Sequence, residues 1–173
     1  MKLAEAQYDN TETGCCARLD VDFWDGQKIV WDSQPFVRDR IRAFLHIPLN
    51  FGSVMTRVHS AVKDAEAYPE HPMWLSDEVS PWRSDLYLAV DRDVPGMKVE
   101  NLSGTFLTKV FEGPYKNAGV WMREMEADVR QKGMEPLKTY FYYATCPGCA
   151  KKFGVNHVVL FTEVADGAVA QAA

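Results

Sequence analysis

The stretch KVFEGPYKNAGVWMREMEADVRQKG, residues 109–133, decides the fold that the sequence predicts. Its first residues end an alternating apolar segment, residues 105–111, which is typical of a strand. A Glu-Gly-Pro break follows at 112–114, and proline is well suited to the head of a helix. Residues 117–132 then carry apolar side chains three and four positions apart, which predicts a helix that Gly133 ends.

The same order of elements extends in both directions from this stretch. A second helix is predicted at residues 50–67, where valines and alanines recur at helical spacing and prolines follow. Strands are predicted at residues 29–31, 34–48, 73–75, 85–90, 97–102, 105–111, 137–144 and 157–164. The main elements of this list follow the order strand-helix-strand-strand twice. The sequence therefore predicts an α+β fold of tandem modules with two main helices on one six-stranded antiparallel sheet.

These modules, at about 34–102 and 103–164, are expected to form a single domain over residues 17–164. Neither module can bury both faces of a three-stranded sheet alone, so the two must pack together. Residues 1–16 and 165–173 are expected to be flexible, because the first are polar without a period and the last are small.

Composition excludes several function classes. The 173 residues carry 24 acidic and 19 basic side chains, and a net charge of −5 gives no long-range attraction for nucleic acid. No apolar run approaches membrane-spanning length, and MKLAEAQYDN lacks the apolar core of a signal peptide. We therefore expect a cytoplasmic protein with reduced cysteines. Aromatic residues make up 12% of the chain, which favours a pocket for a flat apolar ligand.

Three segments carry a resemblance to a known family. Residues 109–133, SPWRSDLYLAV (80–90) and TYFYYATCPGCAKKFGVNHVVLFTEV (139–164) resemble the GyrI-like small-molecule-binding family over about residues 36–164. The resemblance implies the regulatory-factor effector-binding fold, similar to the C-terminal domain of Rob. It also implies an aromatic cleft between the modules for a drug-sized ligand. Some branches of the family are hydrolases that open cyclopropane-bearing genotoxins.

No DNA-binding module is expected beside these elements, so the resemblance implies a stand-alone hydrolase or a binding protein that sequesters its ligand without catalysis. Its partner would be a hydrophobic aromatic small molecule, and its state a monomer or homodimer. Cation-binding members often carry an acid in the strand before the last hairpin. Residues 139–144 hold none, so a neutral ligand is favoured.

Glu112 is the predicted general base. Alternation places it on one strand face with Phe106, and burial beside aromatic rings would disfavour its charged form. Tyr142 or Tyr115 is predicted to hydrogen-bond a conjugated carbonyl of the ligand while water attacks the strained carbon. The alternative for Glu112 is a solvated carboxylate that pairs with Lys116 or stabilises the following helix N-terminus.

The predicted ligand-binding residues are aromatic. Trp82 and Trp121 would sandwich the ligand, and the remaining contacts would come from Tyr87, Phe106 and Tyr140. Trp121 also fits the buried stripe of its helix, and strand tyrosines are common without any role in binding. Trp24 and Trp31 lie outside the resemblance and are assigned to packing.

Cys146-Pro-Gly-Cys149 is the sharpest local motif, with three interpretations. It is a thiol-redox pair, half of a zinc site, or a loop of the closing hairpin. A zinc site needs two more ligands. His157 is within sequence range, and the adjacent pair Cys15–Cys16 is available only if the N-terminus folds over. Adjacent cysteines are awkward tetrahedral partners, so the loop is favoured. No metal or other cofactor is expected, and nucleotide-binding motifs are absent from the sequence.

Overall fold

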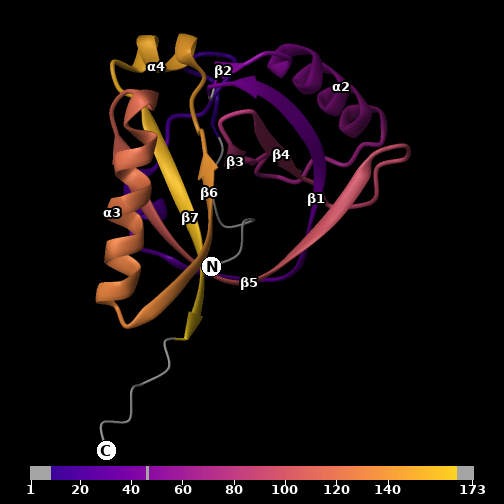
Figure 1. Ribbon diagram of the computed structural model, residues 1–173. Coiled ribbons are helices and arrows are strands. Elements are labelled where there is room, and N and C mark those ends of the chain that lie inside the picture. Colours follow the sequence, from indigo (N-terminus) through magenta and orange to yellow (C-terminus); the bar gives the residue numbers. More distant parts are fainter. Residues whose placement is uncertain (1–8, 46, 167–173) are drawn as a thin grey trace, which may run out of the picture.

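The computed structural model describes residues 9–45 and 47–166, and it has the α+β fold that the sequence predicts (Figure 1). The strands are β1 (Lys28–Phe44), β2 (Ile47–Pro48), β3 (Trp74–Ser80), β4 (Arg83–Ala89), β5 (Lys98–Glu112), β6 (Met134–Tyr142) and β7 (His157–Asp166). The helices are α1 (Val21–Trp24), α2 (Phe51–Asp64), α3 (Ala118–Gln131) and α4 (Pro147–Phe153), with the short 3₁₀ turn η2 (Tyr115–Asn117) before α3. Strand-helix-strand-strand therefore occurs twice, as β1-α2-β3-β4 and β5-α3-β6-β7.

The strands form one antiparallel sheet in the order β2-β1-β4-β3-β6-β7-β5. β1 pairs with β5 as well as with β4, so the pairings lead round the sheet and return to β1. Val37 in the centre of β1 lies opposite Leu88 of β4 and Val99 of β5. This closure gives the sheet an inner and an outer face. Figure 1 shows α2 and α3 on different sides of the molecule, with the long curved β1 between them.

β1 is one strand of 17 residues, where the sequence predicts separate strands at 29–31 and 34–48. The register against β5 shifts between Trp31 and Gln34, and Ser33 adopts a left-handed φ of 56° there. Such a bulge adds residues to one strand without breaking the sheet. Because of it, Trp31 and Phe36 both face inward although they are an odd number of positions apart.

β5 likewise joins the strands predicted at residues 97–102 and 105–111. Gly104 stands at the junction with a φ of 144°, and a Cβ there would lie 3.2 Å from the Glu163 carboxylate. Glycine allows the strand to continue through a conformation that other residues rarely adopt. The module boundary expected at 102 and 103 falls inside this strand, and the division into modules stays a prediction.

Each long helix covers part of the outer face with one apolar stripe. The buried residues of α2 are Val54, Val58 and Val62, and those of α3 are Trp121, Met125 and Val129. The spacing of three and four residues keeps each stripe on the side that meets the sheet. The predicted helical stripes are therefore confirmed. Among the described residues, no helix combines the length and apolar character that crossing a membrane requires.

The CPGC motif begins a helix, so the favoured prediction of a loop is wrong. Cys146 precedes α4 with an extended backbone, and its sulfur accepts a hydrogen bond from the Cys149 N–H. Pro147 occupies the first turn, where a missing N–H costs nothing. Of the segments expected to be flexible, residues 1–8 and 167–173 lie outside the described residues. Residues 10–14 form a turn in which the Gly14 N–H donates to Asn10 O (2.7 Å).

Candidate functional site

The inner face of the sheet is rich in aromatic side chains. Its buried members are Trp24, Ile29, Trp31, Phe36, Met73, Leu75, Tyr87, Ala89, Phe106, Tyr140, Tyr142, Val159 and Phe161. Four residues of the predicted site lie together in this cluster: Tyr87, Phe106, Tyr140 and Tyr142. Strand alternation brings them here, because each stands at an inward position of β4, β5 or β6. We call this cluster the inner core.

A short segment before β1 is docked on β5 over the inner core. The Gly26 N–H donates to Thr108 O (3.1 Å), and the Thr108 N–H donates to Gln27 O (2.9 Å). The Thr108 hydroxyl, itself buried, donates to the carbonyl of Trp24. These bonds extend the sheet locally and fix α1 against it.

The Trp24 side chain is thereby held inside the inner core with only 2% of its surface exposed. The centroid of its ring lies 5.5 Å from that of His71, 5.6 Å from that of Tyr142 and 5.7 Å from that of Phe161. These separations and the tilted or edge-on ring angles are those that aromatic side chains prefer. Trp24 therefore packs directly against Tyr142, one of the predicted site residues.

His71 and Tyr142 form a buried polar pair beside Trp24. The His71 Nε2 lies 3.3 Å from the Tyr142 hydroxyl. Burial lowers the pKa of His71 to about 4, since the charged imidazolium would lose its hydration. The imidazole is neutral near pH 7 and has a proton-accepting nitrogen. A pocket of about 10 Å³ adjoins the pair, lined by Ala17, Arg18, Leu19, Asp20, Trp24, His71, Tyr142 and Ala144.

The inner core also holds hydrogen-bond donors. Among the described residues, Trp31 Nε1 is buried without an acceptor, and such groups call for a specific explanation. Burial raises the pKa of Tyr87 to about 12 and raises that of Tyr140. Both phenols therefore keep their protons at neutral pH and can donate to an uncharged acceptor.

The other predicted aromatic residues lie elsewhere. Trp121 belongs to α3 and packs on the outer face, stacked on Phe111 with ring centroids 5.8 Å apart. Trp82 is 55% exposed at the turn between β3 and β4, where its ring meets that of Phe44. Tyr115 donates its hydroxyl hydrogen to Thr145 O (2.8 Å). These residues do not join the inner core, because they stand on the opposite face or beyond the strand ends.

The sequence analysis expected Glu112 to be buried, and the structure shows that it is exposed. It is the last residue of β5, and its side chain is 72% exposed, 3.9 Å from His157. Phe106 and Val110 face the inner core, as strand alternation predicts. Alternation does not bury Glu112, because the strand ends there at the Gly-Pro break and the side chain extends beyond the sheet into solvent.

The sequence interpretation missed two residues of this site, His71 and Trp24. His71 lies between Pro69 and Pro72, shortly before β3 begins. The two flanking prolines, which restrict the backbone there, were the signal in the sequence that could have drawn attention to this histidine. Trp24 follows a capping Asp20 in a helix of four residues, too short to show a period. Only the packing of distant segments brings both against Tyr142.

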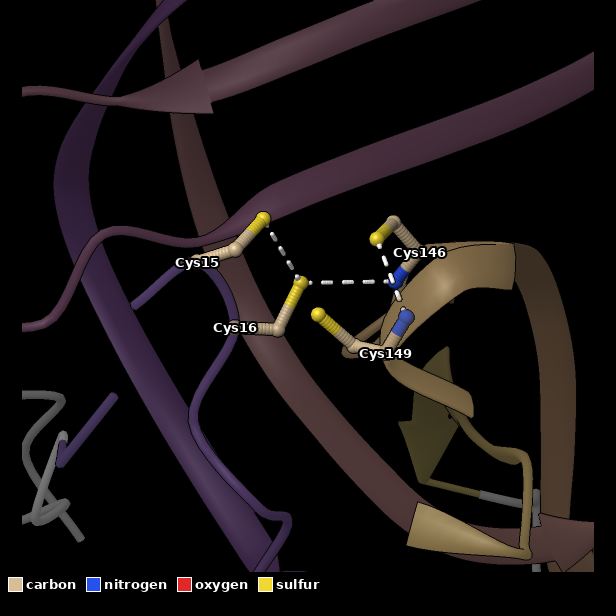
Figure 2. Close-up of side chains that lie close together, drawn as sticks. All are labelled: Cys15, Cys16, Cys146 and Cys149. Carbon is tan, nitrogen blue, oxygen red and sulfur yellow. Dashed lines mark hydrogen bonds between the residues drawn. The ribbon is translucent and has the colours of Figure 1, made fainter. Parts of the chain in front are cut away.

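Four cysteines form a second candidate site (Figure 2). The sulfurs of Cys15, Cys16, Cys146 and Cys149 all lie within 4.8 Å of one another. The N-terminal part of the chain thus reaches α4, which is the condition under which the sequence offered Cys15 and Cys16 as partners of Cys146 and Cys149. The neighbouring Thr13 side chain lowers the pKa of Cys149 to about 6. His157 lies near Glu112 instead of in this cluster.

A closed sheet around an aromatic interior, with one helix on each part of its outer face, defines a protein of the GyrI-like fold class. The chain belongs to the family described as bacterial hydrolase, whose model matches residues 6–164. The predicted fold class is confirmed.

Solved structures agree with this fold. The chain is similar to an uncharacterized conserved protein and to a hydrolase, both from Listeria innocua. In each case the TM-score is 0.60 and the identity 12%, over 82% of this chain and 92% of the other. At such identity the similarity shows the fold alone. No curated protein sequence matches the chain.

Proposed function

We propose that the protein binds a flat, aromatic, drug-sized molecule on the inner face of its sheet and hydrolyses it. The observation that carries this proposal is the buried His71–Tyr142 pair, 3.3 Å apart among aromatic rings. Aromatic side chains supply contact area for a flat ligand, and a few polar groups fix its orientation. Membership of the bacterial hydrolase family supports the hydrolytic step.

Trp24 occupies the position in which such a ligand would stack. The adjoining pocket of about 10 Å³ has room for about one water molecule. Ligand entry in this proposal begins when residues 17–27 move away and withdraw the indole. α1 has only four residues and is docked by a few hydrogen bonds, so this movement leaves the pairing of the long strands intact.

Each polar group then has a role. Neutral His71 accepts a proton from the attacking water. Its low pKa keeps the imidazole unprotonated at neutral pH, although the same shift makes it a weaker base. The Tyr142 hydroxyl donates to a carbonyl oxygen of the ligand and stabilises the charge that develops there. Tyr87, Tyr140 and Phe106 provide the binding surface.

The specific reaction to test is ring opening of a cyclopropane-bearing indole genotoxin, which the GyrI-like resemblance implies. The water oxygen bonds to the strained carbon, the ring C–C bond breaks toward the conjugated carbonyl, and the water proton passes through the base to the product. Glu112 is the base first predicted. His71 is the base that we now favour, because it is buried beside Tyr142 while Glu112 is exposed.

The test is a titration of tryptophan fluorescence with that genotoxin, with the same samples analysed by mass spectrometry for the gain of one water. We expect quenching and water addition by the wild-type protein, loss of water addition in His71→Gln and Tyr142→Phe, and full activity in Glu112→Gln. Quenching with the ligand recovered intact would leave sequestration as the function. If Glu112→Gln alone abolishes turnover, the original assignment of the base is correct and ours is wrong.

A further inference from the structure

The four-cysteine cluster joins two segments that are about 130 residues apart. Cys15 and Cys16 precede the segment that covers the inner core, whereas Cys146 and Cys149 belong to the start of α4. The contact includes a hydrogen bond of 3.4 Å from the Cys146 N–H to the Cys16 sulfur. Figure 2 shows the four side chains directed toward one another from these two segments.

Adjacent cysteines can converge here because of a tight turn around Thr13. The N–H groups of Cys15 and Cys16 both donate to the Thr13 hydroxyl oxygen, at 3.2 and 3.1 Å, and that hydroxyl donates to Cys16 O. Gly14 adopts a left-handed φ of 68° within the turn. The two sulfurs consequently lie 3.7 Å apart on one side of the chain. The objection that adjacent cysteines are awkward partners does not apply to this conformation.

The spacing of the sulfurs fits a tetrahedral metal ion. Four sulfurs bound to zinc at about 2.3 Å define a tetrahedron with edges of about 3.8 Å. The Cys15–Cys16 separation of 3.7 Å matches that edge, and every other pair lies within 4.8 Å. Four thiolate ligands in this arrangement are typical of zinc, whereas oxygen ligands would suit calcium or magnesium.

Backbone N–H groups support the sulfurs as they do in structural metal sites. The Cys149 N–H donates to the Cys146 sulfur, and the Cys146 N–H donates to the Cys16 sulfur, both at 3.4 Å. Such donors offset the negative charge of a coordinated thiolate and fix its direction. The Cys-x-x-Cys turn at the head of α4 therefore supplies both ligands and supporting donors.

We propose that Cys15, Cys16, Cys146 and Cys149 bind one zinc ion that fastens the N-terminal segment to α4. Arg18, which belongs to the segment 17–27, lies over the Phe153 ring of α4, with its guanidinium carbon 4.4 Å from the ring centroid. This segment therefore makes a second contact with α4. The zinc thereby anchors one end of the segment that carries Trp24. The site has all four positions filled by protein ligands, which makes its role structural.

The metal content of the full-length protein, purified without chelator, tests this. Elemental analysis is expected to find one zinc per chain, lost in Cys16→Ser and Cys149→Ser. His157→Gln is the matched control, since His157 is the histidine that sequence spacing offers as a ligand, and it is expected to keep the zinc. Because a cysteine variant can fail to fold, a second measurement uses the wild-type chain.

In that measurement cobalt replaces zinc in the wild-type protein. We expect intense charge-transfer absorption in the near ultraviolet, because four thiolates would be bound to the cobalt ion. Metal-free protein with four reactive thiols would overturn the proposal, as would a disulfide seen as a loss of two hydrogens by mass spectrometry. Iron in place of zinc would overturn the identity of the metal. None of these results depends on hydrolysis, so the zinc site and the proposed function succeed or fail separately.

Discussion

The inner face of this sheet and the part of its outer face under α2 are built from different kinds of side chain. Around α2 the outer face is almost entirely aliphatic, with valines, leucines and alanines packed against one another. The inner face is mostly aromatic and includes phenols and the polar pair His71–Tyr142. An aliphatic core needs only shape and volume to stabilise a fold. Polar atoms buried among rings cost free energy unless they have partners, and His71 and Tyr142 are partners of each other.

The largest expected effect is a loss of stability when Trp121, on the outer face, is truncated. Trp121→Ala removes a buried ring that stacks on Phe111, and truncations of this kind cost about 3–5 kcal/mol of unfolding free energy. Because Trp121 lies on the outer face, affinity of the folded protein for the indole genotoxin should not change. Urea unfolding and fluorescence titration check the two parts. A large loss of affinity with little loss of stability would place Trp121 in the site, as first predicted.

The next effect concerns the pH dependence of stability through His71. Its pKa of about 4 in the folded protein is below the ordinary value of 6.5, so between these values the unfolded chain binds more protons. The free energy of unfolding should therefore fall by ~3 kcal/mol as the pH drops from about 6.5 to about 4. His71→Gln should lose this component. Equal slopes for both proteins would show that His71 is not the buried neutral group.

A smaller effect is expected from the hydroxyl of Tyr142. Tyr142→Phe removes one buried hydrogen bond to His71 and keeps the ring, which should cost about 1 kcal/mol of stability. Turnover should fall much more than stability does. Tyr115→Phe is the matched control, because its hydroxyl bonds Thr145 O away from the inner core. Similar losses of turnover in both variants would contradict the special position of Tyr142.

The smallest effect is predicted for Glu112. Its carboxylate is 72% exposed and 3.9 Å from His157, so Glu112→Gln should change stability by no more than about 0.5 kcal/mol. Thermal unfolding near neutral pH measures it. A substantially destabilised variant would mean that the Glu112 carboxylate makes stronger interactions in the folded protein than its exposure indicates. Glu112 would then again be a candidate for the general base.

Local sequence patterns predicted the elements well where one face alone had to be buried. The stripe of α3 and the Gly133 stop fixed that helix, and alternation placed Phe106, Tyr140 and Tyr142 on one face. The patterns were less informative where a strand bends. The bulge at Ser33 and the left-handed Gly104 interrupt alternation without ending the strand, so single long strands resembled pairs of short ones.

The sequence by itself determined the two helices, the repeated order of elements and the aromatic character of one sheet face, because each depends on neighbours a few residues away. Tertiary structure alone decided which groups meet. His71 reaches Tyr142, and Trp24 covers both, across long stretches of chain. Cys16 meets Cys146 in the same way. Such contacts arise only when the closed sheet brings distant segments together, and no local periodicity records them.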